Sequence, residues 1–224
     1  MCSSDLEGIR EIAGLARKRS VPIRVGVNSG SISKEIRDLY DGVNSKSLAY
    51  SALLACEALE KYGFEEICVS AKAPSPLMMI ETYRILSDHF DYPLHLGVTE
   101  AGTEREGTIR SAIGIGSLLL EGIGDTIRVS LTADPIEEIK AGISILKSLE
   151  LREEGVRLIS CPTCGRTEVD LMNMAEELDA KLAQIKTPLT VALMGCSVNG
   201  PGEAREADVG LAGGRGFFLL FKKG

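Results

Sequence analysis

The 224-residue chain contains no tryptophan and only two histidines, and aromatic residues make up 4% of it. No apolar run approaches the roughly 20 residues that a membrane-spanning helix needs, so we expect no membrane segment. The first residues, MCSSDLEG, show neither a basic stretch followed by an apolar one nor an arginine-rich amphipathic pattern, so no targeting segment is visible. These absences favour a cytoplasmic protein.

Basic charge is also scarce, because 25 lysines and arginines face 32 acidic residues and the net charge is -7. A broad basic surface for nucleic acid is therefore not expected, although a local cation cluster can still bind an anion. Walker, HExxH and GxSxG motifs are absent. The segment AIGIG at 112–116 lies within a helical pattern and lacks the third glycine of a dinucleotide loop, so we reject a nucleotide-binding role for it.

Strand and helix patterns alternate along the first two thirds of the chain. Short apolar or β-branched runs occupy residues 21–28, 66–72, 93–99 and 126–132, and the helices expected after them cover 45–62, 75–90, 107–121 and 135–149. This alternation predicts right-handed crossovers and parallel strands. In such folds the carboxyl ends of the strands carry the chemistry.

Only four such units are visible, whereas a closed β/α barrel needs eight. A helical pattern at 4–19 precedes the first visible strand and suits the crossover helix of an earlier unit, which suggests a truncated chain. We therefore expect a partial barrel over residues 1–151. From 152 to 224 the pattern changes to a small α/β domain, with strands at 156–160, 189–194, 208–211 and 216–222 and a helix at 169–184.

The six cysteines fall into different settings. Cys56 and Cys68 lie in apolar segments, where a small buried thiol is the expected reading. Cys161 and Cys164 form a CxxC, and Cys196 opens a glycine-rich segment after a predicted strand. Without a secretory signal, these three favour metal or redox chemistry over structural disulfides.

Three thiolates leave a metal centre one ligand short. Tetrahedral zinc would take a fourth cysteine or a histidine, but His89 and His95 lie far back in the first domain, which weakens zinc. An iron-sulfur cluster also usually takes four protein ligands. Glu203 is the candidate, because a turn at 199–202 (NGPG) would bring its carboxylate toward Cys196. Spacing alone leaves a solvated loop acid as an equal alternative for Glu203.

Three cations lie on or at the ends of predicted parallel strands: Arg24, Lys72 and Arg128. A charge at such a position is costly unless it faces a partner or an anion. The three together suggest a phosphate clamp, and ion pairs within the barrel are the alternative. Glu100, at the end of its strand, is a candidate general acid or a counter-ion of one of these cations.

Five segments carry a family resemblance: IRVGVNSGS (23–31), HLGVTEAG (95–102), SAIGIGSLLLEGIGDTIRVSLTADP (111–135), CPTCGR (161–166) and MGCSVNGPGEA (194–204). They closely resemble the 4-hydroxy-3-methylbut-2-enyl diphosphate synthases, the iron-sulfur reductases of the methylerythritol phosphate route to isoprenoids. The similarity covers nearly the whole chain. It implies an α/β fold in which the C-terminal half of a TIM-type β/α barrel precedes a small α/β iron-sulfur domain.

The resemblance also implies the chemistry. A 4Fe-4S cluster would be held by Cys161, Cys164, Cys196 and Glu203, with Glu203 also catalytic as the most labile ligand. The family reduces 2-C-methyl-D-erythritol 2,4-cyclodiphosphate to the linear allylic diphosphate with ring opening and loss of water. Its substrate contacts match Arg24, Asn28, Lys72, Arg128 and Ser130, and its catalytic acid matches Glu100.

The resemblance implies partners as well: ferredoxin or flavodoxin as electron donor, and a homodimer in the bacterial cytoplasm in which one subunit's cluster domain caps the other's barrel. Family members begin with further barrel units and continue beyond residue 224, and Pro74 stands where a serine is usual. The alternatives are a catalytically inactive fragment and a non-enzymatic zinc-binding domain.

Overall fold

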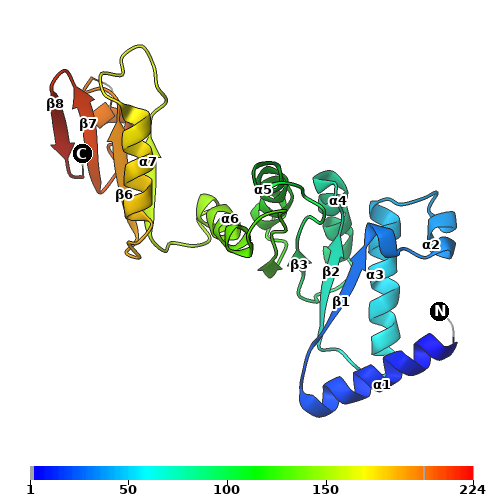
Figure 1. Ribbon diagram of the computed structural model, residues 1–224. Helices are drawn as coiled ribbons and strands as arrows, with labels where there is room; N and C mark the ends of the chain where they lie inside the picture. Colours follow the sequence, from blue (N-terminus) through cyan, green and yellow to red (C-terminus); the bar gives the residue numbers. More distant parts are fainter. Residues whose placement is uncertain (1–2, 199, 224) are drawn as a thin grey trace. The chain divides into compact units, whose positions relative to one another are not determined.

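The computed structural model describes residues 3–198 and 200–223, without the side chains of residues 3–6 and of Glu203. The chain divides into two compact units, Met1–Leu151 and Arg152–Gly224 (Figure 1). Each unit has a hydrophobic core of its own. Among the helices that the structure describes, none has the length and apolar character needed to cross a membrane.

In the first unit the predicted alternation of strands and helices is confirmed. Its elements are α1 (Ser3–Arg19), β1 (Ile23–Asn28), the short 3-10 helix η1 (Ser29–Ser31), α2 (Lys34–Leu39), α3 (Ser45–Glu60), β2 (Ile67–Lys72), α4 (Pro76–Ser87), β3 (His95–Leu96), α5 (Glu104–Leu120), β4 (Thr126–Ile127) and α6 (Pro135–Ser148). The short helix α2 was not predicted. It begins where the Ser33 hydroxyl caps the backbone N–H of Ile36.

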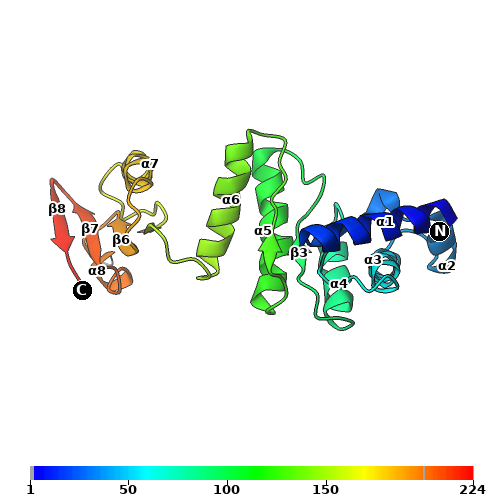
Figure 2. The ribbon, with the colours of Figure 1, turned by 90° about the horizontal axis from the view of Figure 1, so that it is seen from below.

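The four strands run parallel and follow one another in chain order. β1 pairs with β2, β3 pairs with β4, and the N–H of Val69 on β2 donates to the carbonyl of Pro93, just before β3, at 2.8 Å. Helices α3, α4, α5 and α6 stand side by side in the same order (Figure 2). This arrangement is the one that successive right-handed crossovers produce.

Strands β3 and β4 are shorter than the sequence patterns at 93–99 and 126–132 predicted. A tyrosine side chain lies between β2 and β3. The Tyr83 hydroxyl accepts from the N–H of Ala71 at 3.0 Å and donates to the carbonyl of His95 at 2.5 Å, so the phenol stands where a direct backbone bond would continue the ladder. A side chain inserted into a ladder spreads the two strands locally.

The AIGIG segment at 112–116 lies inside helix α5, which confirms that it is not a nucleotide loop. A Cβ added at Gly114 would come within 2.9 Å of a methyl group of Val98 and 3.4 Å of the Met79 sulfur. The glycine therefore lets α5 approach the strand segment and helix α4 closely. Its purpose in this fold is packing.

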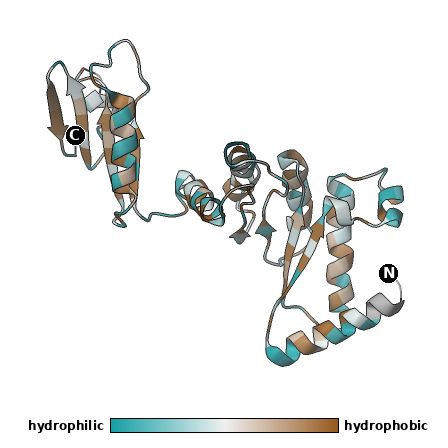
Figure 3. Ribbon diagram, in the orientation of Figure 1, coloured by the Kyte–Doolittle hydropathy of each residue, from teal (hydrophilic) through white to brown (hydrophobic). Residues whose placement is uncertain are grey.

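The second unit contains β5 (Val156–Ser160), α7 (Leu171–Leu182), β6 (Leu189–Met194), α8 (Gly200–Glu203), β7 (Val209–Gly214) and β8 (Phe217–Phe221). Its sheet has the order β5-β6-β7-β8, in which β8 alone is antiparallel to its neighbour. β8 is apolar throughout (Figure 3), and four of its side chains are exposed: Phe217, Phe218, Leu219 and Leu220. The small α/β arrangement predicted for residues 152–224 is thus present.

The turn predicted at 199–202 is wrong in form. Gly200–Glu203 make a single helical turn, α8, closed by the N–H of Ala204 donating to the carbonyl of Gly200 at 3.0 Å. Proline is tolerated there because the first turn of a helix needs no N–H donor at that position. Asn199 lies outside the described residues.

Candidate functional site

Most of the predicted substrate residues lie at the carboxyl ends of the parallel strands, and Arg24 is the exception, because it is the second residue of β1 and pairs in register with Cys68. Asn28 and Lys72 are direct partners in the β1–β2 register. Gly97 lies between Lys72 and Arg128. A Cβ added at Gly97 would stand 3.6 Å from Lys72 Cδ, 3.6 Å from Arg128 Cβ and 2.8 Å from the Arg128 carbonyl oxygen. The absence of a side chain at Gly97 is what allows Lys72 and Arg128 to approach each other.

Glu100 and Ser130 lie on the loops that follow β3 and β4. Glu100 is exposed and holds a positive φ of 53°, a strained region for a side-chain-bearing residue. Ser130 is partly buried. Two backbone contacts, a parallel bridge between Thr103 and Thr132 and the Thr132 N–H donating to Gly102 O at 2.9 Å, hold these two loops together.

The cation cluster, defined as Arg24, Lys72 and Arg128, is electrostatically unbalanced. Only 9% of Lys72 is exposed. Burial lowers the pKa of its ammonium, and the positive charges of Arg128 and Arg24 lower it further. Within the part of the chain that the structure describes, the salt bridges join other residues, and no carboxylate pairs with any of the three. The ion-pair alternative is thus not supported by the described residues.

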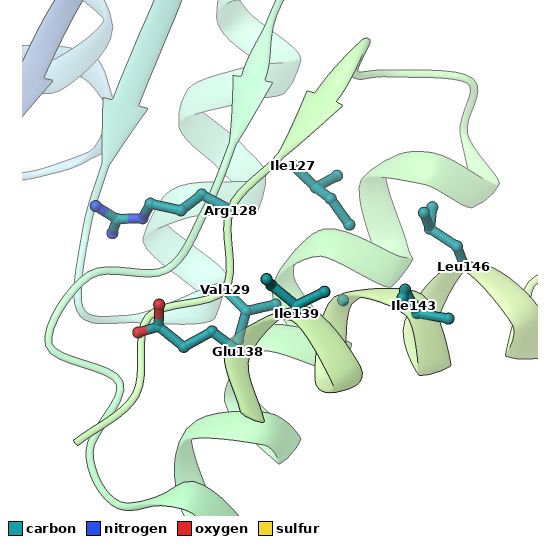
Figure 4. A pocket seen from close by; sticks show the side chains of 8 residues that line it. Ile127, Arg128, Val129, Glu138, Ile139, Ile143 and Leu146 are labelled. Atoms are coloured by element: carbon teal, nitrogen blue, oxygen red, sulfur yellow. The ribbon is translucent and has the colours of Figure 1, made fainter. Parts of the chain in front are cut away.

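Arg128 reaches into this cluster with part of its guanidinium unsatisfied. Its Nη2 donates to the carbonyl of Val98 at 3.4 Å, while its buried Nε finds no partner among the described residues. Figure 4 shows the side chain extending away from Ile143 and Leu146. A partly buried guanidinium with an unpaired Nε donor is suited to an anionic ligand.

A groove of about 290 Å³ lies on the other side of the same strand, between β4 and α6 (Figure 4). Its lining is mostly aliphatic, with Ile127, Val129, Ile139, Ile143 and Leu146 beside Arg128, Glu138 and Gly142. The Glu138 carboxylate is already engaged by the N–H of Leu131 at 2.8 Å. The groove offers few polar groups, and of the cation cluster it includes Arg128 alone.

Sequence reasoning missed His95 as part of the site. The residue is 8% exposed, and its Nδ1 lies 2.8 Å from the hydroxyl of Thr126 on β4. Burial lowers the pKa of the imidazole to about 4, and the cation cluster adds to the effect. A signal was present, because His95 stands two residues before Gly97 and polar residues recur at alternate positions along both strands.

The three cysteines singled out by their motifs lie at one corner of the second sheet. Cys161 directly follows β5 and Cys196 follows β6 after one residue, and these strands pair in parallel up to Ser160 and Leu193. The N–H of Gly195 donates to the Cys161 Sγ at 3.2 Å. Parallel register therefore brings the two segments to the same edge.

Cys164 joins this corner through Thr167. The Thr167 hydroxyl accepts from the N–H of Cys164 at 3.0 Å, and a Cβ added at Gly195 would stand 3.0 Å from the Thr167 methyl carbon. Cys164 is exposed, and the backbone hydrogen bond from Arg166 lowers the pKa of its thiol more than any other cause. Cys196 is buried.

The donor set and its placement suit a metal centre, although the structure does not close one. Among the residues whose side chains the structure describes, no three Cys, His, Asp or Glu residues stand close enough together to hold a metal ion. The predicted fourth ligand, Glu203, has its side chain outside the description. Thiolates from Cys161, Cys164 and Cys196 are ligands of the kind that iron-sulfur clusters use, and a hydrogen bond to a sulfur is one means of tuning such a cluster.

The other cysteines lie in the first unit. Cys56 is buried in α3, as predicted, and desolvation raises the pKa of its thiol to about 12. Cys68 on β2 is only partly buried. Neither lies in the unit that carries the CxxC.

Comparison with known proteins gives consistent matches along the chain. Residues 4–143 match the GcpE TIM-barrel domain, and residues 157–224 match the GcpE protein C-terminal domain. A protein of Ruminiclostridium cellulolyticum is 55% identical over 216 residues, which are 96% of this chain and 61% of that relative. A protein of Clostridium perfringens is 55% identical over 218 residues, 97% of this chain and 62% of the relative.

A third relative, from Geobacter sulfurreducens, is 53% identical over 216 residues, 96% of this chain and 61% of its own length. All three relatives are named 4-hydroxy-3-methylbut-2-en-1-yl diphosphate synthase (flavodoxin). The chain thus spans about three fifths of their length. From the family matches over both units and from this level of identity, the chain belongs to the GcpE family.

Proposed function

We propose that this chain is the substrate-binding and cluster-binding part of a 4-hydroxy-3-methylbut-2-enyl diphosphate synthase. The first unit would be the C-terminal half of a TIM-type barrel and the second an iron-sulfur domain. The observation that carries the proposal is a cluster of three cations, Lys72 buried, Arg128 partly buried and Arg24 exposed, without carboxylate partners among the described residues, in a chain that also carries the two cysteine motifs. The names of the relatives support the same assignment.

The proposed reaction takes a cyclic diphosphate, 2-C-methyl-D-erythritol 2,4-cyclodiphosphate, two electrons and two protons to (E)-4-hydroxy-3-methylbut-2-enyl diphosphate and water. Opening the ring breaks a carbon-oxygen bond, so negative charge develops on the departing phosphate oxygen. Arg24, Lys72 and Arg128 would hold that phosphate in a preorganised arrangement, with Asn28 and Ser130 as neutral hydrogen-bonding groups beside them.

Glu100 would supply the proton for the oxygen that leaves as water. Its place on the loop after β3 is at the same carboxyl edge as Lys72 and Arg128, and its positive φ fits a residue held in place by its surroundings for a functional reason.

Cys161, Cys164, Cys196 and Glu203 would hold a 4Fe-4S cluster. When bound, such a cluster supplies single-electron transfers and a Lewis-acidic iron. Glu203 is the ligand expected to detach most readily, because a carboxylate is harder than a thiolate and a poorer match for this metal centre. The electron donor would be flavodoxin, as the names of the relatives suggest, or ferredoxin, and the functional assembly a homodimer.

Iron and acid-labile sulfide, measured after anaerobic purification and reconstitution, test the cluster. We expect about four irons and four sulfides per chain. Cys161→Ser should abolish this content together with the brown absorbance, while Cys68→Ser, whose thiol lies in the other unit, should keep both. Zinc without sulfide in the unaltered chain would favour the zinc-binding alternative.

Turnover tests the role of Glu203 and needs the full-length protein. Glu203→Ala should keep much of the cluster and lose most of the activity. Unchanged turnover in that variant would refute the role of Glu203 as a labile ligand.

A further inference from the structure

His95 has one ring nitrogen with a partner and one without. Its Nδ1 lies 2.8 Å from the Thr126 hydroxyl, while its buried Nε2 has no hydrogen-bond partner among the described residues. Lys72 is a strong donor close enough to affect the charge of the ring, yet it makes no hydrogen bond to this nitrogen. Buried polar atoms are rarely left unpaired, because each costs the free energy of its lost hydration.

The unpaired nitrogen belongs to the same face of the sheet as the cation cluster. His95 and Gly97 are two residues apart along one extended segment, so their Cβ directions are the same. A Cβ at Gly97 would touch both Lys72 and Arg128. Likewise Thr126, which binds the imidazole, lies two residues before Arg128. The imidazole therefore lies on the same face as Lys72 and Arg128, two residues closer to the amino ends of the strands.

The charges around the ring are positive. Among the described residues, the titratable and charged groups near the ring and its backbone are Arg24 on β1, Cys68 and Lys72 on β2, Tyr83 on α4, and Asp125 and Arg128 at the two ends of β4. The one carboxylate, Asp125, accepts from the N–H of Leu94 at 2.7 Å. A second proton on the ring would add a fourth positive charge to the cluster.

We propose that His95 is an additional anion-contacting residue of this site, and that its neutral imidazole donates a hydrogen bond from Nε2 to a phosphate oxygen held by Arg24, Lys72 and Arg128. The inference rests on the proposed function, which brings a diphosphate to these cations. In this arrangement the Thr126 hydroxyl donates to Nδ1, which fixes the ring hydrogen on Nε2. A neutral donor binds the phosphate without increasing the repulsion among the cations.

Imidazole NMR tests this directly, because the chain has only two histidines. His89, whose Nδ1 contacts the Ile85 carbonyl at 2.6 Å on an exposed helix end, serves as the internal reference. Between about pH 6 and 8 we expect His95 in the neutral form with the hydrogen on Nε2, and we expect inorganic pyrophosphate to shift its Nε2 and Hε2 signals while those of His89 stay in place. A hydrogen on Nδ1, or His95 signals that pyrophosphate does not move, overturns the inference.

Two variants separate hydrogen bonding from packing. His95→Phe keeps a ring of similar size without a donor, and His95→Gln keeps an amide donor near the position of Nε2. At fixed ionic strength we expect pyrophosphate affinity, measured by calorimetry, to fall about tenfold in His95→Phe and to remain within about threefold in His95→Gln, since a hydrogen bond to a charged group is at stake. Equal affinities in both variants would overturn the inference.

The result that would refute the proposed function differs from the results that would refute the role of His95. If iron and sulfide assemble on the cysteines and pyrophosphate binds without involving His95, only the role of His95 is lost. If the chain binds zinc without sulfide, the iron-sulfur function is lost whatever His95 does.

Discussion

Removing the Tyr83 hydroxyl should weaken the first unit far more than its single oxygen atom suggests. Tyr83 is fully buried, and its hydroxyl accepts from the N–H of Ala71 and donates to the carbonyl of His95. Tyr83→Phe keeps the ring but leaves both backbone groups unpaired between two strands. Each lost bond is worth about 1 kcal/mol, and each buried group left unpaired costs about 1–3 kcal/mol. With partial relaxation of the strands, we expect the free energy of unfolding to fall by about 2–4 kcal/mol.

The matched control is Tyr92→Phe. The Tyr92 hydroxyl donates to the Glu60 carboxylate at 2.8 Å at the surface, where water can replace the bond, so its loss should cost at most about 0.5 kcal/mol. Urea unfolding followed by tyrosine fluorescence measures both variants. All five tyrosines lie in the first unit and the chain has no tryptophan, so this signal reports that unit alone. Equal unfolding midpoints in the two variants would refute the bridging role of the Tyr83 hydroxyl.

The pH dependence of stability tests the burial of His95, and two glycine substitutions test the contact between Gly200 and Met194. The folded His95 has a pKa of about 4 against an ordinary 6.5, so below 6.5 the unfolded chain takes up a proton that the folded chain does not, and the free energy of unfolding should fall as the pH drops from 6.5 toward 4. His95→Gln should lose this part of the slope, at most about 3 kcal/mol, in urea titrations at a series of pH values, and parallel pH profiles would contradict the assignment. A Cβ at Gly200 would stand 2.6 Å from Met194 Cβ, so Gly200→Ala should destabilise the second unit by about 1–3 kcal/mol. Gly202→Ala, with open space around the added carbon, should be neutral or stabilising; faster amide exchange on β6 in both variants would show that the contact with Met194 is not the cause.

Periodicity alone predicted the alternation of strands and helices, because an apolar face must recur every second residue in a strand and every three to four in a helix. It also located Arg24, Lys72 and Arg128, since a charge on a predicted strand is conspicuous. The same reasoning predicted β3 and β4 to be longer than they are. It also predicted a reverse turn at 199–202, where Gly200–Glu203 form a single helical turn. These features depend on contacts with other elements of the fold, and a local sequence pattern carries no information about such contacts.

The cysteine motifs determined the kind of chemistry, and the family resemblance proposed the ligands, but only the tertiary structure brought Cys161 beside Gly195. The tertiary structure also determined the contacts of His95, which the sequence could not show. The Tyr83 phenol enters the ladder from a helix, and the register of β3 with β4 sets the imidazole against Thr126. Such contacts join residues 12 and 31 positions apart. A buried nitrogen becomes meaningful only when every neighbour that could have satisfied it is known, and that knowledge exists only in three dimensions.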